Sequence, residues 1–171
     1  LGGMLWLRLG KGSVGTAIDL CDLGLNTIEE TEEQFSIGAM ATLRDIETHQ
    51  GLNAYANGAV ANAVKDIVGV QFRNLATVGG SVFGRYGFSD VITLLLSLDT
   101  YVELYKGGII PLAEFINMPY NRDILVRVIV KKEKINRLRE YPLSATELAE
   151  RIKQVVNIPK NDIIKKTYAI V

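Results

Sequence analysis

The sequence has few of the side chains that build disulfides, metal sites and iron–sulfur clusters. Its 171 residues include one cysteine, Cys21, and one histidine, His49. One cysteine excludes a disulfide within the chain and a cysteine-ligated metal site or iron–sulfur cluster held by this chain alone. We expect Cys21 to be a small buried residue rather than a nucleophile, and His49 to be a surface or helix-capping residue.

The charges are balanced and show no long block of one sign. There are 19 basic and 19 acidic residues, for a formal net charge of zero. A protein that binds nucleic acid or a membrane surface needs clustered basic residues, so neither partner is expected. No apolar run approaches the roughly 20 residues of a membrane span, and no signal-peptide pattern is present. A soluble, cytoplasmic protein is the expectation.

The pattern of apolar residues predicts a mixture of helices and strands. Hydrophobic residues make up 48% of the chain, enough for a real core. We expect a first domain over residues 1–130 and part of a second over 131–171, where the sequence becomes charged and loses its period. The expected strands are 16–20, 23–28, 35–37, 100–105, 109–110 and 124–130. One helix is expected after Thr42, which would cap it, and another over 52–68 with a break at Gly58. A third would begin at Asp90 as its cap, and a fourth would occupy 112–116.

A glycine-rich stretch, residues 71–90, is the centre of the sequence. It contains the pair Gly79-Gly80 and then Gly84 and Gly87. Glycine lets a ligand approach the backbone, and convergent N–H groups near a helix start can hold an anion. The stretch is therefore a candidate cradle for a ligand that carries phosphate. A tight turn between two strands explains the same glycines equally well.

A second glycine pattern lies near the start of the chain. Gly10, Gly12 and Gly15 match G-x-G-x-x-G, which is typical of dinucleotide binding when a helix begins at the third glycine. The residues that follow, 16–20, are β-branched and alternating, and they predict a strand instead. We interpret the segment as a flexible loop, and keep a nicotinamide-binding protein as a minor alternative.

No acid–base machinery accompanies these glycines. The sequence lacks G-x-S-x-G, H-E-x-x-H and G-x-x-x-x-G-K-[ST]. A protein with a ligand cradle and no such machinery often leaves the chemistry to a cofactor.

The glycine-rich stretch resembles the FAD-binding domain of molybdopterin-containing dehydrogenases, the xanthine dehydrogenase and carbon monoxide dehydrogenase group. Residues 71–81, QFRNLATVGGS, match the pattern Q-x-R-N-x-A-T-x-G-G-[NS], and Ser89-Asp90 matches the S-D that leads into an apolar helix. Residues 37–43, 110–115 and 123–125 match further segments in order, so the resemblance covers roughly residues 1–130. It implies an α+β fold: a two-lobed FAD-binding domain of small mixed sheets and helices, with remnants of a C-terminal domain of sheet and helices.

The resemblance also implies which residues bind FAD. Gly2 and Gly3 would form a first loop on the pyrophosphate, and Asp90 would accept hydrogen bonds from FAD hydroxyls. Thr77, Gly79, Gly80 and Ser81 would form the second loop, and Phe83 and Gly84 would border the dinucleotide. Ile124 and Leu125 would pack near a ring. Ala76 and Ser89 complete the expected FAD-binding residues. No catalytic residue and no metal ligand is expected on this chain.

The resemblance implies an oxidoreductase, the electron-transfer subunit of a multi-subunit molybdenum hydroxylase. Molybdopterin and [2Fe–2S] clusters would lie on partner subunits, and FAD would pass electrons to an acceptor such as NAD⁺. Two departures stand out. Met4 replaces a threonine of the first loop, which allows the alternative of a non-catalytic assembly subunit that has lost tight flavin binding. Family subunits are also longer, so we expect a shortened or gapped version of a larger subunit.

Overall fold

The fold is built on a five-stranded antiparallel sheet with the order β1-β2-β5-β3-β4. The computed structural model describes residues 3–5, 10–13, 15–120 and 122–132. The strands are β1 (Ile28–Glu30), β2 (Gln34–Gly38), β3 (Thr100–Leu104), β4 (Gly108–Pro111) and β5 (Leu125–Lys131). Strand β5 comes last in the described chain yet pairs with both β2 and β3, so it joins the early and late hairpins into one sheet.

The two faces of the sheet differ in character. Val128 and Val130 of β5 are fully buried and lie opposite Ile37 and Phe35 of β2, which gives a continuous apolar face. On the other face the neighbouring strands carry polar pairs, such as the Arg127 Nε to Glu103 Oε2 ion pair at 2.8 Å. An antiparallel sheet with one apolar face buries that face against helices.

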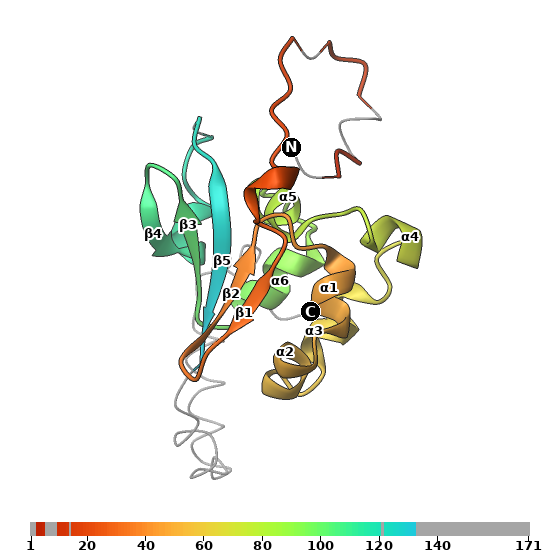
Figure 1. Cartoon of the computed structure of the whole chain (residues 1–171), viewed down its shortest axis with the longest axis vertical. Coiled ribbons are helices and arrows are strands. Elements are labelled where there is room, and N and C mark those ends of the chain that lie inside the picture. Colours follow the sequence, from red (N-terminus) through yellow and green to blue (C-terminus); the bar gives the residue numbers. More distant parts are fainter. Residues whose placement is uncertain (1–2, 6–9, 14, 121, 133–171) are drawn as a thin grey trace, which may run out of the picture.

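The helices supply that cover, and α1 to α6 lie on one side of the sheet (Figure 1). A short 3₁₀ helix, η2 (Cys21–Leu23), precedes the sheet. The α-helices are α1 (Leu43–Thr48), α2 (Gln50–Tyr55), α3 (Ala59–Val64), α4 (Val70–Arg73), α5 (Val78–Phe83), α6 (Asp90–Leu96) and α7 (Leu112–Phe115). The helices are short, so packing on the sheet must stabilise them more than their intrinsic propensity does.

Several local predictions are confirmed at the helix ends. Thr42 and Asp45 form a reciprocal capping box at α1, with Asp45 N donating to Thr42 Oγ1 at 3.0 Å and Thr42 N donating to Asp45 Oδ2 at 2.8 Å. His49 caps α2, because its Nδ1 accepts from Leu52 N at 3.1 Å. Gly58 divides the alanine-rich segment with φ +80°, a conformation that glycine adopts without strain.

Other local predictions are wrong. Residues 16–20 form no strand, and 16–19 are exposed; alternation of apolar residues alone does not make a strand. The strand expected over 23–28 begins only at Ile28. Cys21 is exposed, not buried. Ser89 rather than Asp90 caps α6, because the Ser89 hydroxyl accepts a hydrogen bond from Ile92 N at 3.2 Å. Asp90 is the first helical residue, where its carboxylate interacts favourably with the helix dipole.

The predicted boundary near residue 131 remains a prediction. Strand β5 ends at Lys131, and residues 133–171 lie outside the described part of the chain.

We predict that Gly79→Ala destabilises the fold, although alanine in a helix normally gains about 0.5–1 kcal/mol over glycine. A Cβ at position 79 would lie 2.6 Å from both Cβ and the carbonyl oxygen of Ala39. Overpacking of this kind costs about 1–3 kcal/mol in the free energy of unfolding, measurable by urea titration. Gly12→Ala is the control, because a Cβ there meets nothing within 4 Å. Equal stability of Gly79→Ala and wild type would contradict the close packing.

Candidate functional site

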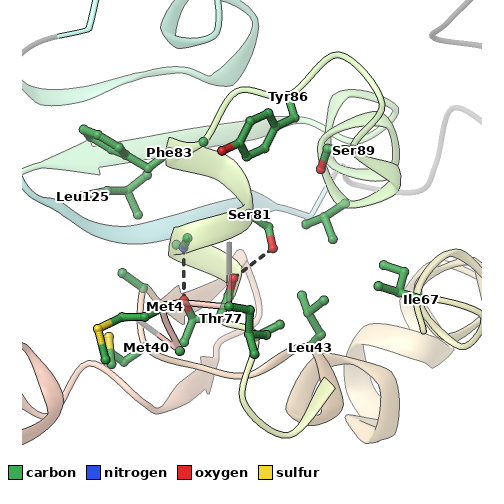
Figure 2. A pocket seen from close by; sticks show the side chains of 18 of the residues that line it. Met4, Met40, Leu43, Ile67, Thr77, Ser81, Phe83, Tyr86, Ser89 and Leu125 are labelled. Carbon is green, nitrogen blue, oxygen red and sulfur yellow. Dashed lines mark hydrogen bonds between the residues drawn. The ribbon is translucent and has the colours of Figure 1, made fainter. Parts of the chain in front are cut away.

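A cavity of about 600 Å³ lies where the N-terminal segment, α5, the start of α6 and the start of β5 meet (Figure 2). This volume is within the range of about 300–1,000 Å³ that small-molecule sites occupy. Twelve of the thirteen residues predicted for FAD line it: Gly3, Ala76, Thr77, Gly79, Gly80, Ser81, Phe83, Gly84, Ser89, Asp90, Ile124 and Leu125. The thirteenth, Gly2, lies outside the described residues. Residues far apart in the sequence therefore share one site.

The predicted glycine cradle is the first turn of helix α5, not a turn between two strands. Thr77 caps this helix, with its Oγ1 accepting from Gly80 N at 3.1 Å. Val78 N and Gly79 N donate to the carbonyls of Ala41 and Ala39 at 2.8 and 2.9 Å. The N–H groups expected to meet a phosphate thus already bond within the protein.

The two glycines of the pair have different surroundings. Gly79 is buried against Ala39, so packing alone requires it. Gly80 is exposed and lines the cavity, and the nearest atom to an added Cβ is Thr77 Oγ1 at 3.0 Å. The missing side chain at Gly80 therefore leaves room that a ligand can use.

The N-terminal segment reaches the cavity through Gly3. A Cβ at Gly3 would lie 2.0 Å from the carbonyl oxygen of Leu75, so only glycine allows the backbone to come this close. The contact places Gly3 beside Ala76 and Thr77, the residues that lead into α5. The two glycine loops inferred from the resemblance are therefore adjacent in space.

The cavity is apolar with a few polar groups, and no lysine or arginine is among its described lining residues. Ser81 Oγ donates to Thr77 O at 3.0 Å, and Asp90 is an exposed carboxylate at the rim. This lining suits flat ring systems better than a bare phosphate, since side chains offer no positive charge.

Asp123 orders the rim next to Ile124. Burial raises the pKa of the Asp123 carboxyl, but backbone N–H groups of Lys106, Ile124 and Gly107 donate to it and leave its pKa below the ordinary value of 3.8. One carboxylate thus joins the β3–β4 turn to the start of β5.

Aromatic rings form another part of the wall. Tyr86 and Phe88 stack with centroids 5.3 Å apart and an interplanar angle of 20°. The Arg85 guanidinium lies 5.6 Å from the Phe83 ring centroid and 4.0 Å from the Phe115 ring centroid. The Tyr120 hydroxyl donates to Gly84 O at 2.7 Å, which fixes the chain after α5.

Most of the apolar wall carries no recognisable signal in the sequence. The lining residues that were not predicted to bind FAD include Met40, Leu43, Ile67, Val68, Phe72, Tyr86 and Phe88. Met4, which replaces the threonine of the family's first loop, is 41% exposed and lies beside Met40 in Figure 2. Apolar residues at these positions read as ordinary core, so only the tertiary structure assigns them to a cavity.

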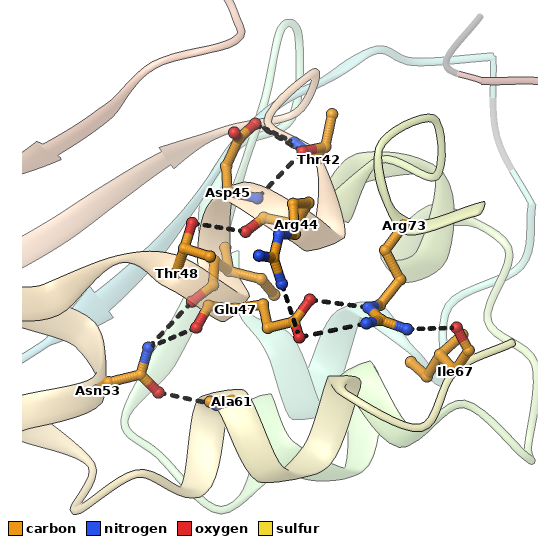
Figure 3. Close-up of polar contacts among 10 residues, drawn as sticks. Thr42, Arg44, Asp45, Glu47, Thr48, Asn53, Ala61, Ile67 and Arg73 are labelled. Atoms are coloured by element: carbon orange, nitrogen blue, oxygen red, sulfur yellow. Dashed lines mark hydrogen bonds and ion pairs between the residues drawn. The ribbon is translucent and has the colours of Figure 1, made fainter. Parts of the chain in front are cut away.

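A nearly buried ion pair supports the wall that contains Ile67 (Figure 3). Arg73 Nε and Nη2 donate to the two carboxylate oxygens of Glu47 at 2.7 and 3.2 Å, and Arg73 Nη1 donates to Ile67 O at 3.2 Å. The hydrogen bond from Arg73 holds the pKa of the Glu47 carboxyl below its usual range, with Arg44 adding to the effect and burial opposing it.

The remaining expectations concern the first glycine pattern, metals and membranes. No helix begins at Gly15, and Gly10, Gly12 and Gly15 do not line the cavity, so the nicotinamide alternative lacks its structural requirement. Within the described ranges, no group of three His, Cys, Asp or Glu side chains could hold a metal ion. None of the helices in that part of the chain is long and apolar enough to span a bilayer.

Comparison with known families identifies the family of this chain. Residues 2–135 match the model of the FAD binding domain in molybdopterin dehydrogenase. The chain belongs to this family. It is 27% identical over 115 residues to the uncharacterized protein YgfM of Escherichia coli (strain K12), an alignment that covers 67% of this chain and 42% of YgfM. It is 32% identical over 97 residues to aldehyde oxidase 2 of Cavia porcellus, covering 49% of this chain and 7% of that protein.

Solved structures show the same fold. Carbon monoxide dehydrogenase from Hydrogenophaga pseudoflava, in a form that lacks the Mo-pyranopterin moiety of the molybdenum cofactor, matches with a TM-score of 0.57 and 24% identity over 64% of this chain and 40% of that chain. Quinoline 2-oxidoreductase from Pseudomonas putida 86 matches with a TM-score of 0.57 and 19% identity, over 64% and 41% of the two chains. The α+β prediction is confirmed, and the chain spans less than half the length of these relatives.

The cofactor of this family is FAD, and the cavity fits its ring systems. The volume, the apolar lining and the open side of Gly80 leave room for a flat ligand. The negative charge of the diphosphate finds no basic side chain among the described lining residues, and the N–H groups of Gly79, Gly80 and Ser81 already bond within the protein.

We predict that Glu47→Gln lowers the free energy of unfolding by about 3 kcal/mol at neutral pH, because it leaves the Arg73 guanidinium buried without its counter-charge. A lowered pKa in the folded state gives stability that is present above the ordinary value of 4.5 and is lost as the pH falls through the lower, folded value. The difference between wild type and Glu47→Gln should therefore shrink on acidification. Urea titrations at several pH values measure it, and a constant difference would contradict the coupling.

Proposed function

We propose that the chain binds FAD in the 600 Å³ cavity and acts as the electron-transfer subunit of a multi-subunit molybdenum hydroxylase. One observation carries the proposal: the residues that the family resemblance assigns to FAD, scattered from Gly3 to Leu125, converge on one cavity. The partners would be a molybdopterin-binding subunit and a [2Fe–2S] subunit, and electrons from the clusters would leave through FAD to an acceptor such as NAD⁺. We place this complex in the cytoplasm.

The described residues would bind and orient the cofactor rather than exchange protons with a substrate. Bound FAD would supply the redox chemistry, as cofactors do in proteins without their own acid–base groups. Phe83, Leu125 and the apolar wall would contact rings and exclude water, while Gly80 leaves the backbone open. The Asp90 carboxylate would accept hydrogen bonds from ligand hydroxyls at the rim.

Met4 favours a second candidate function, a non-catalytic assembly subunit of the same complex. Its thioether lies at the cavity, and its backbone has φ +55°, an uncommon conformation for a residue with a side chain. A bulky residue held there narrows the site where the first glycine loop would meet the diphosphate. On this alternative the chain keeps the fold and binds flavin weakly.

We predict that the purified 171-residue chain shows flavin absorption bands that stay with the protein, alone or after FAD is added and excess removed. Gly80→Leu should abolish them without unfolding the chain, because its side chain would fill the space open to the ligand. Gly12→Leu is the matched control, since that glycine has open space around it and lies off the cavity. Circular dichroism verifies that both variants are folded.

The same spectra separate the two candidates. A wild-type chain that takes up no FAD, with a Met4→Gly variant that does, would favour the assembly subunit. Retention of flavin by Gly80→Leu would contradict placement of FAD in this cavity.

A further inference from the structure

The cavity wall formed by Ile67, Val68 and Phe72 contains a backbone conformation that its sequence disfavours. Val68 has φ +54°, in the left-handed region, where a side chain branched at Cβ is a genuine outlier. Its side chain is also 80% exposed, so burial in the protein does not offset the strain. Gly69, the residue suited to such a φ, is adjacent and adopts an extended φ of −154° instead. Stability alone does not explain valine at this position.

The residue before Val68 is held at both its N–H and its carbonyl. Ile67 N donates to Val64 O at 3.0 Å, and the Ile67 carbonyl accepts from Arg73 Nη1 at 3.2 Å. Just after Val68, helix α4 begins, and its first bond runs from Arg73 N to Gly69 O at 3.0 Å. Arg73 itself is 5% exposed and is fixed by its two hydrogen bonds to Glu47. The peptide group that precedes Val68 is therefore tied, through the Ile67 carbonyl, to a buried arginine.

We propose that Arg73 and Glu47 are positioning residues that hold Val68 in its strained conformation, so that the valine side chain contacts an aromatic ring of the bound dinucleotide. Strained residues persist only where their surroundings over-determine them, and they cluster at ligand sites. An uncharged, branched side chain can pack on a ring but offers nothing to a phosphate. This inference rests on the proposed function, because it takes FAD as the ligand.

Val68→Gly separates strain from ligand contact. The substitution relieves the positive φ and removes the side chain, so the ligand-free variant should melt at a higher temperature than wild type yet bind FAD on the order of tenfold more weakly. Asn57→Gly is the matched control: Asn57 also has a positive φ, +51°, and does not line the cavity. It should keep the wild-type affinity, with a smaller rise in melting temperature because asparagine tolerates this conformation.

Arg73→Lys tests whether the arginine acts through Val68. Lysine keeps the charge but cannot reach two carboxylate oxygens and the Ile67 carbonyl with one planar group. The melting temperature should fall in both the wild-type and the Val68→Gly backgrounds. The affinity for FAD should fall only where Val68 is present, as a double-mutant cycle reveals. The visible circular dichroism of bound flavin should change as well, a readout that loss of stability alone does not move.

The outcomes separate this inference from the proposed function. If wild type binds FAD but Val68→Gly binds it equally well, the contact is overturned while the proposed function stands. Additive effects of Arg73→Lys and Val68→Gly on affinity would overturn the positioning role of Arg73. If wild type takes up no FAD at all, the proposed function and this inference are both overturned.

Discussion

The close approach of α5 to the loop after β2 is the contact on which the cavity depends. It is possible only because Gly79 has no Cβ, and it is fixed by the hydrogen bonds from Val78 N and Gly79 N to the carbonyls of Ala41 and Ala39. These bonds satisfy two donors that a helix start otherwise leaves unpaired. They also anchor Thr77 and Gly80 at the cavity, so the packing of the core and the shape of the site have one origin.

Strand β5 extends this arrangement to the other side of the site. It pairs with β2 and β3, and its first residue, Leu125, lines the cavity. Because Asp123 ties the β3–β4 turn to the residues just before β5, the rim is continuous with the sheet. A site built on a strand and two helix starts holds its shape better than one built on loops alone.

The glycines and the apolar residues of the wall have different roles in the cavity. Glycines 3, 79 and 80 let backbone segments approach one another or a ligand, whereas Phe83, Val68 and their neighbours provide contact area. Close contacts at Gly3 and Gly79 leave no room for a side chain, so the glycines form recognisable motifs. The wall needs only apolar residues of suitable size, which many sequences satisfy.

This division explains how much of the protein could be predicted. Local signals sufficed for the capping box of Thr42 and Asp45 and for the break at Gly58, because each depends on neighbours in sequence. The predicted strand over 124–130 is confirmed as β5, which finds its partners in β2 and β3. The strand predicted over residues 16–20 is wrong, because a strand also needs a neighbouring strand and the alternation of apolar residues does not provide one. Either Ser89 or Asp90 could cap α6 by residue type, and only the geometry of the chain that enters α6 makes Ser89 the cap.

The sequence by itself determined a mixture of helices and strands, through the periodicity of its apolar residues, and the family, through motifs that resemble those of its FAD-binding domain. Only the tertiary structure decided that Gly3 lies against Leu75, that the N–H groups of Val78 and Gly79 are already bonded, and that Val68 is held at a positive φ. Each of these depends on contacts between segments distant in the chain, and no local propensity encodes such contacts.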